Sequence, residues 1–412
     1  MTDGSTEMAR VEQSSILEEI SRARSITDSL FSQVLPKAIY DRPLRERHRI
    51  VFYIGHLEAF DWNILGKGVL GAGPITEELD SLFAFGIDPS AGQLPDDEAT
   101  DWPNVSEVRR YVSQVRRNLE RRIPQIPEHA IRIALEHRLM HAETLTYLIH
   151  NLPYSRRMTR TRRVYSKCQS PPLQFIQIPA GIATLGRTRG EGFGWDNEYD
   201  LHTKQVEAFA VSKYKVTNEQ YLEFVNDGGP APHYWMERSG KWRYRGFDGE
   251  IPLPGDLPVF VSYLQADAYA RWAGKALPTE AQFHRAAFGS PSGSERQYPW
   301  GSDYPREEHG NFGFRLSDLV PVTANPSGDS AFGVSQLTGN GWEWTATRFA
   351  PFPGFKPEPL YPGYSANFFD GEHYVVKGAS SATDHVFLRR SFRNWFRDYY
   401  GYAYTTFRLV EN

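Results

Sequence analysis

The sequence is poor in cysteine and has no long apolar run. Cys168 is the single cysteine among 412 residues, which excludes an intrachain disulfide and any chemistry that needs two cysteines of one chain. No apolar stretch reaches the roughly 20 residues that a membrane-spanning helix requires. The N-terminal segment is polar and has no hydrophobic signal core. We therefore expect a cytoplasmic protein that is held together by packing and has no membrane partner.

Neither sign of charge dominates. Lys and Arg number 46 against 50 Asp and Glu, which gives a net charge of −4 at pH 7. A chain with this balance has no general attraction to nucleic acid, and we expect no nucleic-acid partner. What the sequence does have is apolar material, with 40% hydrophobic and 14% aromatic residues. This is enough for two domains with hydrophobic cores.

Helical spacing of apolar residues dominates the first part of the chain. It predicts helices over residues 14–35, 47–65, 104–122 and 127–151. The third of these has a basic outer face, which we interpret as a solvated helix surface. Four helices of these lengths predict an antiparallel bundle, and bundle cores commonly hold metal ligands from facing helices.

The pattern changes after a basic tract at residues 155–164 and a turn-rich stretch at 166–172. We place a domain boundary there, which gives domains of residues 1–160 and 161–412. The second domain has short strand-like runs at 175–178, 205–212, 374–377 and 406–410, interrupted by two helices at 218–226 and 263–274. This mixture predicts an α+β domain with much irregular loop.

Two histidines on the fourth helix are the first candidate site. His137 and His141 are four residues apart, so both imidazoles lie on one helix face, where they could share a metal. Glu143 lies about 200° round the helix from His141 and should not join them. Such histidine pairs also occur on ordinary amphipathic helices, so a metal site needs a further ligand. His56, in the middle of the strongly apolar second helix, is a buried polar residue that needs a partner.

Several motifs then point to one family. Gly194-Trp-Asp-Asn-Glu198, Leu277-Pro-Thr-Glu-Ala-Gln-Phe283 and Gly339-Asn-Gly-Trp-Glu-Trp344 follow the histidines. Together they resemble the ergothioneine synthase family of non-haem iron sulfoxide synthases, over nearly the whole chain. The resemblance implies an N-terminal DinB-like four-helix bundle and a C-terminal α+β domain of the formylglycine-generating-enzyme type, which is similar to C-type lectins. It also implies that His56, His137 and His141 bind Fe(II).

The resemblance implies an oxidoreductase. In that family, iron and dioxygen join the imidazole carbon of hercynine or histidine to the sulfur of a cysteine-type donor. Three neutral imidazoles suit this chemistry, because they leave Fe(II) with its full charge and three open positions. Tyr364 corresponds to a catalytic tyrosine that could donate a proton. Among the aromatic residues of the C-terminal tail, we expect Phe396 and Tyr404 to contact the cationic betaine of hercynine.

The expected donor site departs from the family pattern. Related synthases carry an Arg-x-x-Arg pair that binds γ-glutamylcysteine, whereas Ser90 and Gln93 stand at these positions here. With Asp88, these residues suit a neutral, hydroxyl-rich donor better than an anionic peptide. This favours the selenoneine synthase branch, with a selenosugar or thiosugar as donor. The alternative is an ergothioneine-type enzyme that uses γ-glutamylcysteine or cysteine.

Two other classes compete with this interpretation. A formylglycine-generating oxidase needs a pair of cysteines to hold copper, and this sequence has only one. A non-catalytic module that binds a sugar or a protein would share the C-terminal fold. Bound iron and consumption of dioxygen would exclude that module.

Overall fold

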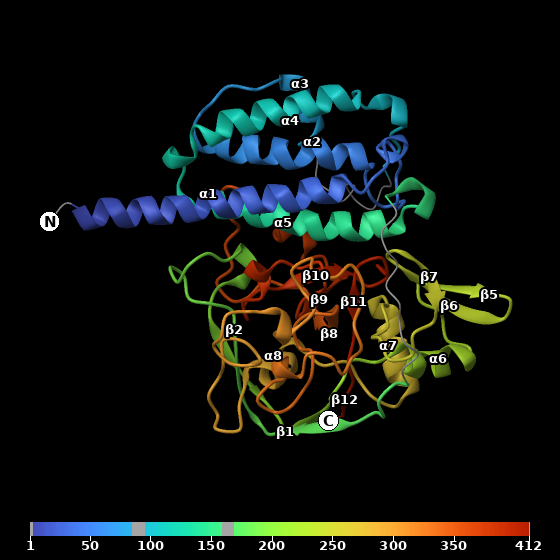
Figure 1. The fold of residues 1–412 in the computed structure, drawn as a ribbon. Coiled ribbons are helices and arrows are strands. Elements are labelled where there is room, and N and C mark those ends of the chain that lie inside the picture. Colours follow the sequence, from blue (N-terminus) through green and yellow to red (C-terminus); the bar gives the residue numbers. More distant parts are fainter. Residues whose placement is uncertain (1–2, 85–94, 159–168, 412) are drawn as a thin grey trace. The chain divides into compact units, whose positions relative to one another are not determined.

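The computed structural model describes residues 3–84, 95–158 and 169–411, with side chains from residue 16 onward. The chain divides into two compact units, residues 1–160 and 161–412 (Figure 1). The first is helical and the second combines helices with small sheets. The two-domain layout, a helical part followed by an α+β part, is therefore the one that the sequence predicts.

The helical unit is built around four long helices whose axes run alongside one another (Figure 1). Helix α1 packs on α5, and α2 packs on α4. The helix α4 begins where the Asn104 side chain accepts a hydrogen bond from the Glu107 backbone, a standard N-terminal cap. The α-helices are α1 (Asp3–Phe31), α2 (Ile50–Asp61), α3 (Glu77–Leu82), α4 (Val105–Glu120) and α5 (Glu128–Asn151).

Helix α2 differs from the predicted element mainly at its C-terminal end. All of its residues except Ile54 are buried, which agrees with its apolar sequence. It does not stop at Asp61 but continues as a π-helix, η2 (Trp62–Val69). The short helix α3 was not expected from the sequence. Helix α1 begins at Asp3, eleven residues before the predicted start, and ends at Phe31, four residues before the predicted end.

Among its described residues, 169–411, the second unit has four small sheets rather than one large one. In strand order they are β1-β4-β12, β10-β9-β8-β11, β2-β3 and β5-β6-β7. Neighbouring strands are antiparallel except β8 and β11. The strands are β1 (Phe175–Ile178), β2 (Gly181–Leu185), β3 (His202–Val206), β4 (Phe209–Ser212), β5 (Trp235–Arg238), β6 (Lys241–Gly246), β7 (Gly249–Pro252), β8 (Trp342–Arg348), β9 (His373–Lys377), β10 (Asn394–Arg397), β11 (Thr405–Thr406) and β12 (Val410–Glu411).

The helices of this unit are α6 (Asn218–Asn226), α7 (Tyr263–Trp272) and α8 (Glu280–Phe288). The sequence prediction was wrong at several points here. Residues 406–410 are not one strand, because β11 pairs with β8 whereas β12 pairs with β4. Residues 205–212 are not one strand, because β3 pairs with β2 whereas β4 pairs with β1 and β12. Helix α8 was missed, although it contributes Phe283 and Ala287 to the main hydrophobic core.

Ion pairs tie one buried glutamate of each of the three motifs to an arginine near the C-terminus. Glu198 accepts hydrogen bonds from Arg389, and Glu280 accepts them from Arg393. Glu343 accepts from Arg408 in the same way, at 2.5 and 2.8 Å. Charged pairs of this kind survive burial only when their hydrogen bonds are satisfied. The motifs therefore fix the path of the C-terminal segment.

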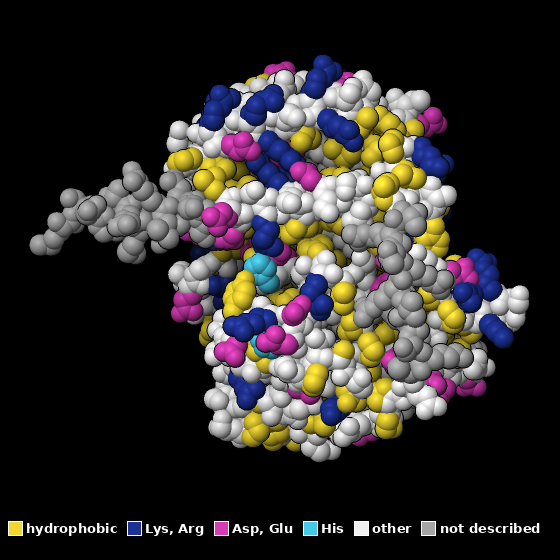
Figure 2. All heavy atoms as spheres, in the orientation of Figure 1, with side chains coloured by type: hydrophobic (Ala, Val, Ile, Leu, Met, Phe, Trp, Pro, Cys, Tyr) yellow, Lys and Arg dark blue, Asp and Glu magenta, His cyan; other side chains and the backbone are white. Residues whose placement is uncertain are grey.

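The surface carries mixed charge. Lys and Arg side chains lie over α4 (Figure 2), as the sequence predicts for a solvated helix face. Arg116 of this face is engaged in ion pairs with Asp28 and Glu58. Within the described residues, no helix combines the length and apolar character of a membrane span.

Candidate metal centre and aromatic cluster

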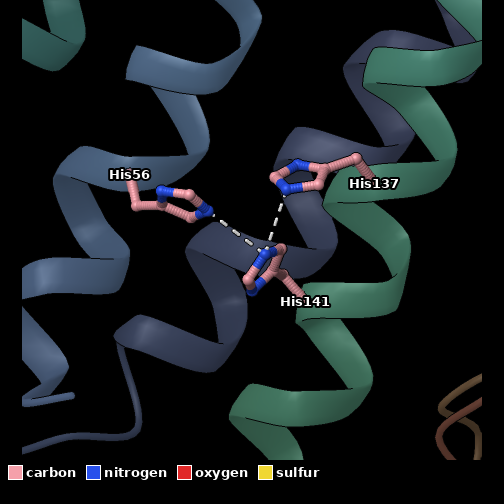
Figure 3. A group of neighbouring side chains, drawn as sticks. All are labelled: His56, His137 and His141. Atoms are coloured by element: carbon pink, nitrogen blue, oxygen red, sulfur yellow. Dashed lines mark hydrogen bonds between the residues drawn. The ribbon is translucent and has the colours of Figure 1, made fainter. Parts of the chain in front are cut away.

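Three histidines from two helices converge in the helical unit. His56 lies on α2, and His137 and His141 lie one turn apart on α5 (Figure 3). Their ring nitrogens lie within 4.8 Å of one another, and all three side chains are buried. The structure thus brings together the three residues that the sequence singled out as metal ligands.

The distances fit a shared ion. The Nε2 atoms of His56 and His141 are 3.3 Å apart, and those of His141 and His137 are 3.1 Å apart. Imidazole nitrogens bind divalent metals at about 2.0–2.1 Å, so two ligands of one ion lie roughly 2.8–3.4 Å apart for angles between 90° and the tetrahedral value. Both measured separations lie in this range. The third pair, His56 and His137, lies within 4.8 Å, and these two nitrogens must be no more than about 4.2 Å apart for all three to bind one ion.

The site favours neutral imidazoles. Burial lowers the pKa of His56 to about 4, and the positive charge of Arg138 contributes to the shift. Burial also lowers the pKa of His137 and of His141 well below the usual value. A protonated imidazole cannot bind a metal through that nitrogen, so the electrostatics keep the ligands available at neutral pH.

Neighbouring groups fix the orientation of the rings. The His56 ring stacks on Phe52 at a centroid distance of 4.7 Å, and the His137 ring stacks on Phe60 at 3.4 Å. The Nδ1 atom of His56 lies 2.7 Å from the carbonyl oxygen of Phe83, which can only accept a hydrogen bond. Nδ1 therefore carries the proton, and the Nε2 lone pair faces the other two histidines.

A buried charge cluster joins the two ligand-bearing helices. Arg138, between the two histidines in α5, donates to Asp61 at 2.6 Å and lies 3.0 Å from Glu58, both on α2. Arg116 of α4 also donates to Glu58. Arg138 thus sets the register between α2 and α5, and with it the relative positions of the three histidines. Glu143 is partly exposed and is not in the histidine group.

The second unit contains a cluster of aromatic rings around Tyr364. This residue is 6% exposed. Its ring stacks on Trp195 at 3.8 Å and meets Trp395 edge-on at 5.4 Å. Next to it, the Ser365 hydroxyl donates to Asp196, which also accepts from the Glu358 backbone. Asp196 therefore holds the loop that carries Tyr364.

The other two predicted substrate contacts lie in different ring groups. Phe396 is half-buried and stacks on Tyr400 at 5.7 Å. Tyr404 is 2% exposed, and its ring stacks on Phe260 at 4.9 Å. Tyr404 thus has the surroundings of a core residue. A role for Tyr364, Phe396 or Tyr404 toward substrate stays a prediction.

The predicted donor contacts Asp88, Ser90 and Gln93 lie outside the described residues, and so does Cys168. Their roles also stay predictions.

Comparison with known proteins identifies the second unit. The family of the sulfatase-modifying factor enzyme 1-like domain matches residues 161–412. The chain belongs to this family. Among curated proteins, it is 38% identical to the hercynine oxygenase of Mycobacterium tuberculosis over 235 residues, which are 52% of this chain and 55% of that protein. It is 27% identical to ergothioneine biosynthesis protein 1 of Neurospora crassa over 93% of this chain and 56% of that protein.

The chain is also 29% identical to the formylglycine-generating enzyme of Bos taurus, over 47% of this chain and 63% of that enzyme. The chain spans about half the length of the hercynine and ergothioneine relatives that it matches. The similarity to the ergothioneine protein extends over both units, whereas the match to the family model is confined to the second.

Sequence reasoning missed one group in each unit, one in the aromatic cluster and one at the metal centre. One is Trp195, whose ring stacks on that of Tyr364. It lies in the motif at residues 194–198, which supported the family resemblance but gave Trp195 no predicted role. The other is the carbonyl of Phe83, which orients His56. Every residue type has a backbone carbonyl, so no sequence signal could have identified it.

Proposed function

We propose that this protein is an iron(II)- and dioxygen-dependent oxidoreductase that joins the imidazole carbon of hercynine to the sulfur of a thiol donor. The helical unit would be a DinB-like bundle whose His56, His137 and His141 hold the iron. The observation that carries the proposal is the convergence of three buried Nε2 atoms at 3.1 and 3.3 Å. The similarity to a hercynine oxygenase and to an ergothioneine biosynthesis protein supports the choice of substrate.

In this proposal the metal ligands, Arg138 and Tyr364 would have separate roles. His56, His137 and His141 would hold the iron as neutral imidazoles, and bound iron would supply the activation of dioxygen and of the donor sulfur. Arg138 keeps α2 and α5 in register through Glu58 and Asp61. Tyr364 would donate a proton during bond formation.

The donor is the point on which relatives and sequence differ. The relatives' names support ergothioneine-type chemistry, in which the donor is γ-glutamylcysteine or cysteine. Ser90 and Gln93 in place of an arginine pair favour an uncharged selenosugar. We take carbon–sulfur bond formation as the proposal, because two relatives support it, and treat the selenosugar as the competing outcome of the test.

The test is a donor competition. Anaerobically prepared protein is loaded with Fe(II), given hercynine with cysteine, γ-glutamylcysteine or the selenosugar, and exposed to oxygen. Mass spectrometry follows the coupled products, and an electrode follows oxygen uptake. The proposal expects a hercynine–sulfur product with a thiol donor. A higher kcat/KM with the selenosugar than with either thiol would instead assign the protein to the selenoneine synthase branch. Bound hercynine without oxygen uptake or product with any donor would support a non-catalytic binding module.

A further inference from the structure

We propose that the short helix α3 and its C-cap residue Phe83 hold the metal ligand His56 in its binding orientation; we call this segment, residues 77–83, the bracket. Phe83 and Gly55 are the positioning residues for His56. The inference rests on the proposed function in one respect, because it assumes that His56 is a metal ligand. It adds a role for a segment that contributes no ligand itself.

The contact at the centre of the bracket is a hydrogen bond. The Nδ1 atom of His56 donates to the carbonyl of Phe83 at 2.7 Å. In metal sites, a bond of this kind fixes the tautomer and the ring direction of the ligand and raises its basicity. Phe83 is the C-cap residue that directly follows the last residue of α3. The position of that helix end therefore decides whether His56 Nε2 faces the other two histidines.

Gly55 makes the approach of Phe83 possible. Phe83 is completely buried. A Cβ atom built on Gly55 would lie 2.5 Å from three atoms of the Phe83 ring. No real Cβ contact is that short, so any larger residue at 55 would displace the ring. Because the ring and the carbonyl belong to one residue, the hydrogen bond to His56 would shift with it.

Asp80 anchors the rest of α3. This carboxylate is 1% exposed. It accepts a hydrogen bond from the Tyr111 hydroxyl at 2.8 Å and pairs with Lys67 at 2.7 Å. It also accepts from the backbone of Ile75 at 3.2 Å. These contacts tie α3 to α4 and to η2, so the bracket is fixed from two neighbouring elements as well as by the Phe83 ring.

The first test needs no metal and no turnover. In metal-free protein labelled with 15N-histidine, long-range proton–nitrogen NMR spectra distinguish the two neutral tautomers of His56. The bracket requires the proton on Nδ1 in the wild type and a mixture of tautomers in Gly55→Ala. A wild-type His56 with its proton on Nε2 would overturn the inference, whatever the protein's activity.

The second test is a metal titration with a matched control. Gly55→Ala should weaken Fe(II) or Co(II) binding by about tenfold or more, the usual effect of losing an outer-sphere partner. Gly66→Ala is the control, because its Cβ would lie 2.5 Å from the Trp62 ring in the same continuous helix but does not touch Phe83. The double variant Gly55→Ala/Phe83→Leu should recover affinity, since the smaller side chain makes room for the methyl group.

The outcomes separate this inference from the proposed function. If the wild type binds no metal, the proposed function fails, and the tautomer measurement alone decides on the bracket. If the wild type binds metal and Gly55→Ala binds it equally well, the bracket fails and the proposed function stands. Should Gly55→Ala not fold, Tyr111→Phe removes one anchor of Asp80 and must still lower metal affinity; an unchanged affinity would refute the bracket.

Discussion

Replacing Arg138 by methionine should destabilise the helical unit strongly. Arg138 is 2% exposed and makes its closest contacts with Asp61 at 2.6 Å and Glu58 at 3.0 Å. Removing one partner of a buried ion pair costs about 3–5 kcal/mol, because the other charge remains without compensation. Glu58 would keep its contact with Arg116 at 2.8 Å. Most of the destabilisation therefore comes from the uncompensated Asp61 carboxylate, and we expect Arg138→Met to lower the free energy of unfolding by about 3 kcal/mol.

Urea unfolding followed by far-ultraviolet circular dichroism measures this loss. Arg132→Met is the control, since Arg132 lies on the same helix and also pairs with two carboxylates, but its side chain is 23% exposed. Such pairs contribute about 0–1 kcal/mol. Asp61→Asn in the Arg138→Met background should recover part of the stability. Burial raises the pKa of Asp61, so the loss should be smaller at pH 5, where this carboxyl group takes up a proton more readily, than at pH 8. Equal losses in Arg138→Met and Arg132→Met would refute the argument.

Three further predictions concern the second unit. Burial lowers the pKa of His284 well below its usual value, so the neutral imidazole contributes fully to the free energy of unfolding above the unfolded-state pKa of about 6.5, and this contribution is lost as the pH falls. The wild type should therefore lose about 1.4 kcal/mol more than His284→Gln between pH 7.5 and 5.5. An equal loss in the two proteins would contradict this. Glu343→Gln leaves Lys215 and Arg408 as buried cations, which should lower stability by about 3–5 kcal/mol in urea unfolding, and a loss below about 1 kcal/mol would speak against it. Tyr364→Phe keeps the stacked ring and removes the hydroxyl, so it should slow bond formation or divert turnover to oxidation of the donor while hercynine binding stays nearly constant; an unaltered rate and product ratio would end this assignment.

The sequence predicts the long elements and the histidine pair of α5 because both rest on periodicity. Helix α5 spans Glu128–Asn151, within one residue of the prediction, and α6 and β1 have the predicted limits. An apolar helix with a histidine in its middle must bury that histidine beside a partner. His56 is buried as expected, but its grouping with the pair on α5 came from the family resemblance, because spacing alone does not say which buried group is its partner.

The remaining features depend on information that periodicity does not carry. The chain leaves one sheet and enters another at the exposed residues 207–208, so a continuous strand pattern hides two strands. Helix α8 did have a signal, the capping box formed by Thr279 and Gln282. Helix α3 is only six residues long, and its contribution to the site is a backbone carbonyl.

Iron binding tests the central claim most directly. Anaerobic equilibrium dialysis with Fe(II) should give one tightly bound ion per chain in the wild type and in Glu143→Gln. His56→Ala should bind iron weakly, and His137→Ala/His141→Ala should bind none. One tightly bound ion in that double variant, or loss of iron in Glu143→Gln, would contradict the assignment of the three histidines as the metal ligands.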